Sequence, residues 1–213
     1  VAVFFGLLFV LAVCSFSSSW VFPDLVPQKF DLRSLTYLSV HLHDIGLSLL
    51  SSVLYSFGTI LLTLLLTIAP ARLFARNSFR GKTFIEGILL TPALVPPMSF
   101  AMGAHYLFIY LDLADRVTGV ILILGLYTYP YMLRALTAGY LACNEEFTLC
   151  ARNMGASWLR IFWKIELPLL LPAIVAGGTI VFLVSFSEYF LVFLIGGGNV
   201  SSYSGYIFPL LNS

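Results

Sequence analysis

Apolar residues gather in five long runs along the chain, and polar residues separate these runs. A helix needs about 20 mainly apolar residues to cross the hydrocarbon core of a bilayer. The first run is shorter than that, and no basic segment precedes it, so we interpret it as a clipped span rather than a signal peptide. The pattern predicts an all-α, polytopic transmembrane helix bundle with about five spans. The runs cover residues 1–16, 45–70, 84–111, 117–141 and 168–195.

Composition agrees with a membrane protein. Hydrophobic residues make up 60% of the chain and charged residues only 10%, which is far from the balance of a soluble domain. We therefore expect lipid to surround much of the chain. The net charge is only +1 and gives no reason to expect nucleic acid as a partner.

Basic residues are concentrated in two of the predicted loops. Cytoplasmic loops of membrane proteins are enriched in Lys and Arg, so the loops after the second and fourth runs are predicted to be cytoplasmic. The polar stretch from Ser17 to Asp44 is then external, and the N-terminus is cytoplasmic. The basic residues of the two cytoplasmic loops are Arg72, Arg76, Arg80, Lys82, Arg152, Arg160 and Lys164.

The second of these loops, residues 142–168, has the pattern of two short helices joined at a glycine. Asn144 can cap the first helix, and the two glutamates after it favour a helix N-terminus. Gly155 suits a left-handed C-terminal cap. Ser157 can cap the second helix, which we expect Pro168 to end. The loop is therefore predicted to form a helical elbow on the cytoplasmic surface.

One face of the second short helix is apolar. Trp158, Phe162 and Ile165 recur at helical spacing, whereas Arg160 and Lys164 point elsewhere. The spacing by itself fits either a knob that a soluble partner grips or an ordinary amphipathic helix at the membrane interface.

The same loop resembles a known family. Gly155, nine further residues, Ile165, one residue and Leu167-Pro168 match the G-x9-I-x-L-P core of the EAA loop. This loop marks the permease subunits of binding-protein-dependent ABC importers. Ala156 and the residues Phe162 and Pro172 extend the match. The Glu-Ala-Ala of the family falls on Leu149-Cys150-Ala151, so its acidic residue is absent here.

Segments on both sides of the loop are similar to the polyamine, ferric-iron and thiamine branch of these permeases. They are Phe79-Arg80-Gly81-Lys82, Thr91-Pro92 with Pro96-Pro97, and Phe186-Ser187-Glu188-Tyr189 with the glycines 196–198. The resemblance covers about residues 35–213.

The resemblance implies a single permease domain over residues 1–213 with a type I ABC importer fold, incomplete at both ends, and a sixth span after Ser213. It implies a bacterial inner-membrane protein whose partners are a cytoplasmic ABC ATPase dimer, a second permease subunit of the same or a different chain, and an external substrate-binding protein. The ATPase, not this chain, would hydrolyse ATP. The loop over 142–168 would couple to the ATPase through Leu149, Cys150, Ala151, Gly155, Ala156, Trp158, Phe162, Ile165, Leu167 and Pro168.

Three residues inside predicted spans are candidates for the translocation pathway. An ionisable group inside a span is costly and normally faces the bundle interior or a water-filled path, so Glu188 is expected to line the pathway and meet a cationic substrate. The alternative is a buried carboxyl group that is paired with another helix or held protonated. Pro96 and Pro97, together with Pro92, are expected to break or kink the third run beside a cavity. Arg134 is expected to extend to the cytoplasmic surface.

Other functions fit fewer features. A secondary transporter or channel subunit has the same composition but does not explain the glycine–proline loop. An intramembrane enzyme lacks a recognisable catalytic motif. No metal site or cofactor is indicated, because Cys14, Cys143 and Cys150 lack metal-binding spacing and His41-x-His43 has no third ligand nearby.

Overall fold

A computed structural model describes residues 5–6, 10, 17–19, 29–30, 33–143 and 145–210. Most of the predicted first span, the predicted cap Asn144 and the end after Leu210 lie outside the described residues. The chain divides into two units, Val1–Leu47 and Ser48–Ser213. In the first unit, β1 (Ser17–Ser19) and β2 (Lys29–Phe30) pair antiparallel, and α2 (Arg33–Val40) follows.

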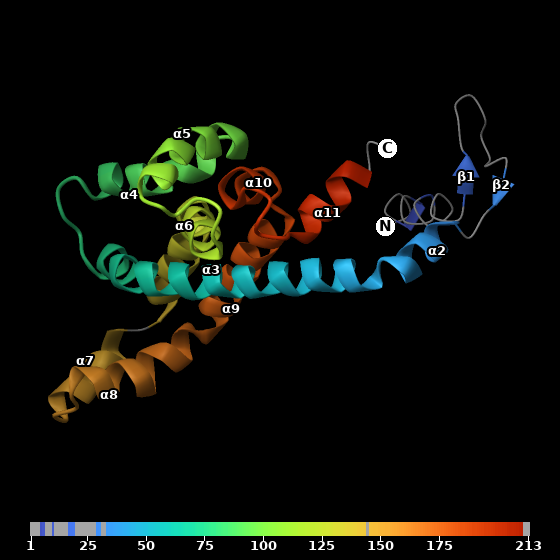
Figure 1. Cartoon of the computed structure of the whole chain (residues 1–213). Coiled ribbons are helices and arrows are strands. Elements are labelled where there is room, and N and C mark those ends of the chain that lie inside the picture. Colours follow the sequence, from blue (N-terminus) through green and yellow to red (C-terminus); the bar gives the residue numbers. More distant parts are fainter. Residues whose placement is uncertain are drawn as a thin grey trace. The chain divides into compact units, whose positions relative to one another are not determined.

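Three helical stretches of the described chain are long and apolar enough to cross a membrane. They are α3 (Leu42–Arg76), α6 (Val117–Ala142) and the stretch Trp158–Ser187. The first two contain the predicted runs 45–70 and 117–141. Apart from the short strands β1 and β2, the regular structure of the described chain is helical. The all-α prediction is therefore confirmed (Figure 1).

The predicted third run forms two helices with a sharp bend between them. It comprises α4 (Lys82–Leu90) with the 3-10 turn η1 (Thr91–Leu94), followed by α5 (Pro97–Tyr110) at a bend of 102°. Val95 and Pro96 between them have extended ψ angles of 132° and 137°. A proline disfavours the helical conformation of the residue before it and lacks an N–H of its own. The expected break at Pro96-Pro97 is therefore confirmed.

The predicted fifth run contains a second break, which the apolar pattern did not indicate. Instead of one helix over 168–195, α9 (Leu167–Ser187) ends before Glu188, which is extended with φ −73° and ψ 120°. Then α10 (Phe190–Gly196) begins, and α11 (Tyr203–Leu210) follows a turn. The carboxylate Oε1 of Glu188 accepts a hydrogen bond from the N–H of Phe190 at 3.2 Å. This bond satisfies a donor that the start of α10 would otherwise leave unpaired.

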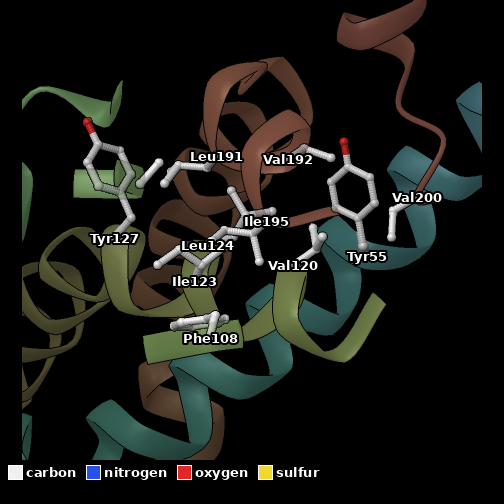
Figure 2. Packing of buried hydrophobic residues seen from close by; sticks show 11 residues of the cluster. Tyr55, Phe108, Val120, Ile123, Leu124, Tyr127, Leu191, Val192, Ile195 and Val200 are labelled. Carbon is white, nitrogen blue, oxygen red and sulfur yellow. The ribbon is translucent and has the colours of Figure 1, made fainter. Parts of the chain in front are cut away.

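Helix α6 lies at the centre of the second unit. Of its most apolar stretch, 61% is buried within the protein, against 28% for α3 and 22% for Trp158–Ser187. Figure 2 shows Ile123 and Leu124 of α6 packed near Leu191 and Ile195 of α10, with Phe108 of α5 close by. The other two stretches therefore leave more of their surface for lipid or for other chains.

Helix α3 buries a stripe of small hydroxyl residues. The side chains of Thr59, Thr63 and Thr67 donate to the carbonyl four residues earlier, at 2.8, 2.9 and 2.6 Å. These bonds satisfy the hydroxyls without a second helix, and small side chains let helices approach closely.

Candidate functional site

The segment Glu145–Glu166 forms the helical elbow that the sequence predicts. It consists of α7 (Glu145–Asn153), α8 (Trp158–Ile161) and the π-helical turn η2 (Phe162–Glu166). Figure 1 shows α7 and α8 projecting from the ends of α6 and α9, away from α4, α5 and α10. We call this segment the elbow.

Gly155 forms the corner of the elbow. Its φ is +81°, a left-handed conformation that suits glycine. The N–H of Gly155 donates to the carbonyl of Arg152, and the N–H of Ala156 to that of Ala151, both at 3.0 Å. The corner thus satisfies carbonyls at the end of α7, as a C-terminal cap does. Ser157 precedes α8 as predicted, but its side chain makes no capping hydrogen bond.

Pro168 does not end the second helix of the elbow, so that expectation was wrong. The helix continues from Trp158 through Pro168 to Ser187. The N–H of Leu167 donates to the carbonyl of Phe162, five residues earlier. Such a π turn shifts the hydrogen-bond register just where Pro168 has no N–H to donate. The chain thereby accommodates the proline within a continuous helix.

The predicted apolar face of the elbow is only partly exposed. Trp158 is 59% exposed and stacks on Phe162 at a ring distance of 6.1 Å, but Phe162 and Ile165 are half-buried. Leu159 and Trp163, a pair at i,i+4 spacing, are each 61% exposed. Sequence reasoning missed this pair, although the same spacing rule could have found it. Met154 at the corner is also exposed.

The remaining predicted coupling residues differ in burial. In α7, Leu149 and Cys150 are exposed, whereas Ala151 is buried against the rest of the protein. Leu149 stands where the family has a glutamate, and its side chain is exposed. Ala156 and Leu167 are half-buried and Pro168 is exposed.

Two arginines of α3 contact the two ends of the elbow. Arg72 pairs with Glu166 at 2.8 Å, and the Glu166 side chain is only 7% exposed. Arg76 donates to the carbonyl of Cys143 at 3.0 Å and lies 3.7 Å from the carboxylate of Glu145. We call Arg72 and Arg76 the arginine clamp. The sequence places both in a basic loop but does not indicate their partners.

The helices that follow the two breaks meet. α5 and α10 pack against each other, and a cavity of about 330 Å³ lies between them, lined by Met98, Met102, Phe190 and Phe193 among others. Pro96 and Pro97 stand at the start of α5, and the half-buried Glu188 stands just before α10. The carbonyl of Glu188 accepts a hydrogen bond from the hydroxyl of Ser204 at 3.0 Å.

Arg134 is an exposed cation on the central helix α6. It shares one face with Ala138 and Leu141, which are also exposed. Among the described residues, no carboxylate lies within ion-pair distance of it. Within the same residues, no group of three or more His, Cys, Asp or Glu side chains could hold a metal ion.

Comparison with protein families gives a match over nearly the whole chain. The model described as "binding-protein-dependent transport system inner membrane component" matches residues 2–210. Among solved structures, the crystal structure of a bacterial ABC transporter involved in alginate import is similar, with a TM-score of 0.68 over 99% of this chain and 80% of that one. At 18% identity, this likeness concerns the fold.

Several curated relatives are permease proteins of molybdate/tungstate or molybdenum transport systems. The molybdate/tungstate transport system permease protein of Pyrococcus abyssi is 28% identical over 79% of this chain and 67% of its own length. The molybdenum transport system permease protein of Haemophilus influenzae is 31% identical over 65% of this chain and 66% of its own length. These relatives do not support the expected polyamine, ferric-iron and thiamine branch.

Proposed function

The chain belongs to the family of binding-protein-dependent transport system inner membrane components, and on that premise we propose that it forms half of the translocation pathway of an ATP-driven importer. Its relatives are transport permeases of ABC importers rather than enzymes. The other half would be a second permease subunit of the same or a different sequence, and the cargo would arrive on a substrate-binding protein outside the inner membrane.

The elbow is the proposed contact with a cytoplasmic ATPase dimer. The observation that carries this proposal is the exposed apolar surface of Trp158, Leu159 and Trp163 on a projecting element. Burial of large aromatic side chains is a common source of binding energy at protein interfaces. Leu149 would give an apolar contact where the family has a glutamate, since its side chain is 47% exposed.

The translocation pathway is proposed to run beside the two helix breaks. Non-helical backbone at membrane depth is tolerated only where protein buries it or where it borders a water-filled cavity. The breaks at Pro96-Pro97 and at Glu188 belong to two spans that pack together through α5 and α10. Both breaks are therefore candidates for the border of the pathway.

For the cargo we propose a tetrahedral oxyanion of the molybdate class. The named relatives belong to molybdate/tungstate and molybdenum transport systems, and Arg134 is an exposed cation in a candidate span with no ion-pair partner among the described residues. Arg134 lies about 12 Å along the helix axis from Ala142, at 1.5 Å per residue. Its Cα–Cβ bond points toward the helix N-terminus, away from the nearer end of α6. The alternative role is extension of the side chain to the cytoplasmic surface, as the sequence predicts.

Uptake in proteoliposomes tests this function. The full-length permease would be reconstituted with its ATPase and binding protein, and labelled molybdate counted with and without internal ATP. We expect uptake that requires both partners and that excess tungstate abolishes, while spermidine and ferric citrate leave it unchanged.

Two results would contradict the proposal. Uptake without ATP or the ATPase would favour a secondary transporter or channel. Uptake that spermidine or ferric iron blocks but tungstate does not would overturn the oxyanion class and support the cationic branch instead.

A further inference from the structure

We propose that the arginine clamp makes α3 part of the coupling machinery, so that the inner end of α3 moves with the elbow. This inference rests on the proposed docking of the elbow to an ATPase. The elbow continues directly into α9, so its movement reaches that span through the backbone. Arg72 and Arg76 connect the elbow to a second span, α3, so its movement also reaches α3. In the chain, α3 precedes the elbow by more than one helix.

The Arg72–Glu166 pair fixes the end of the elbow nearest the membrane spans. The two charged groups lie 2.8 Å apart, and the side-chain exposures are 29% for Arg72 and 7% for Glu166. Charge-assisted hydrogen bonds are directional and shorter than neutral ones, and removing one partner of a buried pair is strongly unfavourable. Apolar contacts between helices are non-directional and restrain sliding less. The pair is therefore suited to transmit displacement along the membrane normal.

Arg76 holds the other end of the elbow. It lies one helical turn beyond Arg72 on the same side of α3. Its guanidinium donates to the carbonyl of Cys143, the residue that follows α6, and faces the carboxylate of Glu145, the first residue of α7. One helix thus contacts both the entry and the exit of the elbow.

A small cavity lies between these two contacts. Its volume is about 10 Å³, and Arg76, Tyr140, Thr148 and Glu166 are among its lining residues. Glu166 Oε2 and the Tyr140 hydroxyl are buried with no hydrogen-bond partner among the described residues. A cavity of roughly 10–15 Å³ holds one water molecule. Residues of α3, α6 and the elbow thus meet around this cavity.

The clamp can be tested by measuring molybdate uptake per ATP hydrolysed in the reconstituted full complex. We expect Arg72→Gln and Glu166→Gln each to lower this ratio at least about fivefold, the lower range of typical coupling between sites. The double variant Arg72→Gln/Glu166→Gln should be no worse than either single variant, because one interaction is lost in all three. The exchanged pair Arg72→Glu/Glu166→Arg should recover part of the ratio.

The controls separate this inference from the proposed function and from misfolding. Arg80→Gln alters an exposed arginine in the turn just after α3, for which no partner is present among the described residues, and it should match the wild type. Arg76→Gln leaves no buried charge unpaired, since Glu145 is 54% exposed, and should still lower the ratio.

If every clamp variant keeps the wild-type ratio, or if the two single effects multiply in the double variant, the proposed role of the clamp is overturned while the proposed importer function stands. A wild-type complex without ATP-driven uptake would instead overturn the proposed function.

Discussion

Gly155 closes α7 at a φ of +81°, and among the described residues no atom outside the two adjacent residues lies within 4 Å of the position that a Cβ would occupy. A substitution there is therefore opposed by backbone conformation rather than by a clash. A left-handed conformation costs an ordinary residue about 1–2 kcal/mol, and asparagine less.

We expect Gly155→Leu to change the angle between α7 and α8 and to uncouple ATP hydrolysis from uptake without unfolding the spans. Gly155→Asn should retain most of the coupling, because asparagine tolerates the left-handed region. Uptake per ATP hydrolysed, measured with the amount of assembled complex, checks both variants. Unchanged coupling in the leucine variant would contradict the role of this corner.

The hydrogen bond that the Glu188 side chain accepts can also be accepted by glutamine. Its Oε1 accepts the N–H of Phe190, and a glutamine carbonyl can accept the same bond. With an oxyanion as cargo, we expect Glu188→Gln to retain uptake and Glu188→Ala to lower it through loss of the cap, worth about 0.5–2 kcal/mol at a helix N-terminus. Loss of uptake in the glutamine variant would favour the alternative that the carboxylate charge meets a cationic substrate.

At the scale of elements, the π turn η2 sets how α8 is rotated about the helix axis relative to α9. Pro168 supplies no N–H, so an alanine there would restore a donor and favour ordinary α-helical bonding through Phe162–Glu166. That change would rotate Trp158 and Leu159 away from their present directions.

We therefore expect Pro168→Ala to lower the coupling ratio while the complex still assembles. Pro172→Ala is the matched control, because Pro172 lies inside α9 beyond the π turn. The measurement is again uptake per ATP hydrolysed. Equal behaviour of the two variants would mean that the register at η2 does not position the elbow.

At the scale of the whole molecule, the basic loops predict that the elbow is cytoplasmic and that the start of α6 is external. Cys150 on α7 is exposed and free, and Thr118 in the first turn of α6 is exposed. Membrane-impermeant maleimide should label a Thr118→Cys variant in intact cells, in a chain whose native cysteines are replaced by serine. A chain that keeps Cys150 alone should react only after permeabilisation. The reverse pattern would overturn the orientation.

The features that depend on neighbouring residues could be predicted from the sequence alone. Apolar runs of sufficient length gave α3 and α6, and the backbone restrictions of proline gave the break before α5. The left-handed corner at Gly155 followed from residues close to it in the chain. Family membership could likewise be inferred from one contiguous segment, whereas the substrate branch could not.

The features that join distant segments depend on how the whole chain folds. The continuous helix through Pro168 depends on a shift in hydrogen-bond register that composition does not indicate. The break at Glu188 lies in a run whose hydrophobicity continues past it, and it is stabilised by a specific side-chain acceptor. The pairing of Arg72 with Glu166 exists only because folding brings the end of α3 beside the end of the elbow. Local periodicity can place each of these charges in a loop, but only three-dimensional packing selects the partner that each one meets.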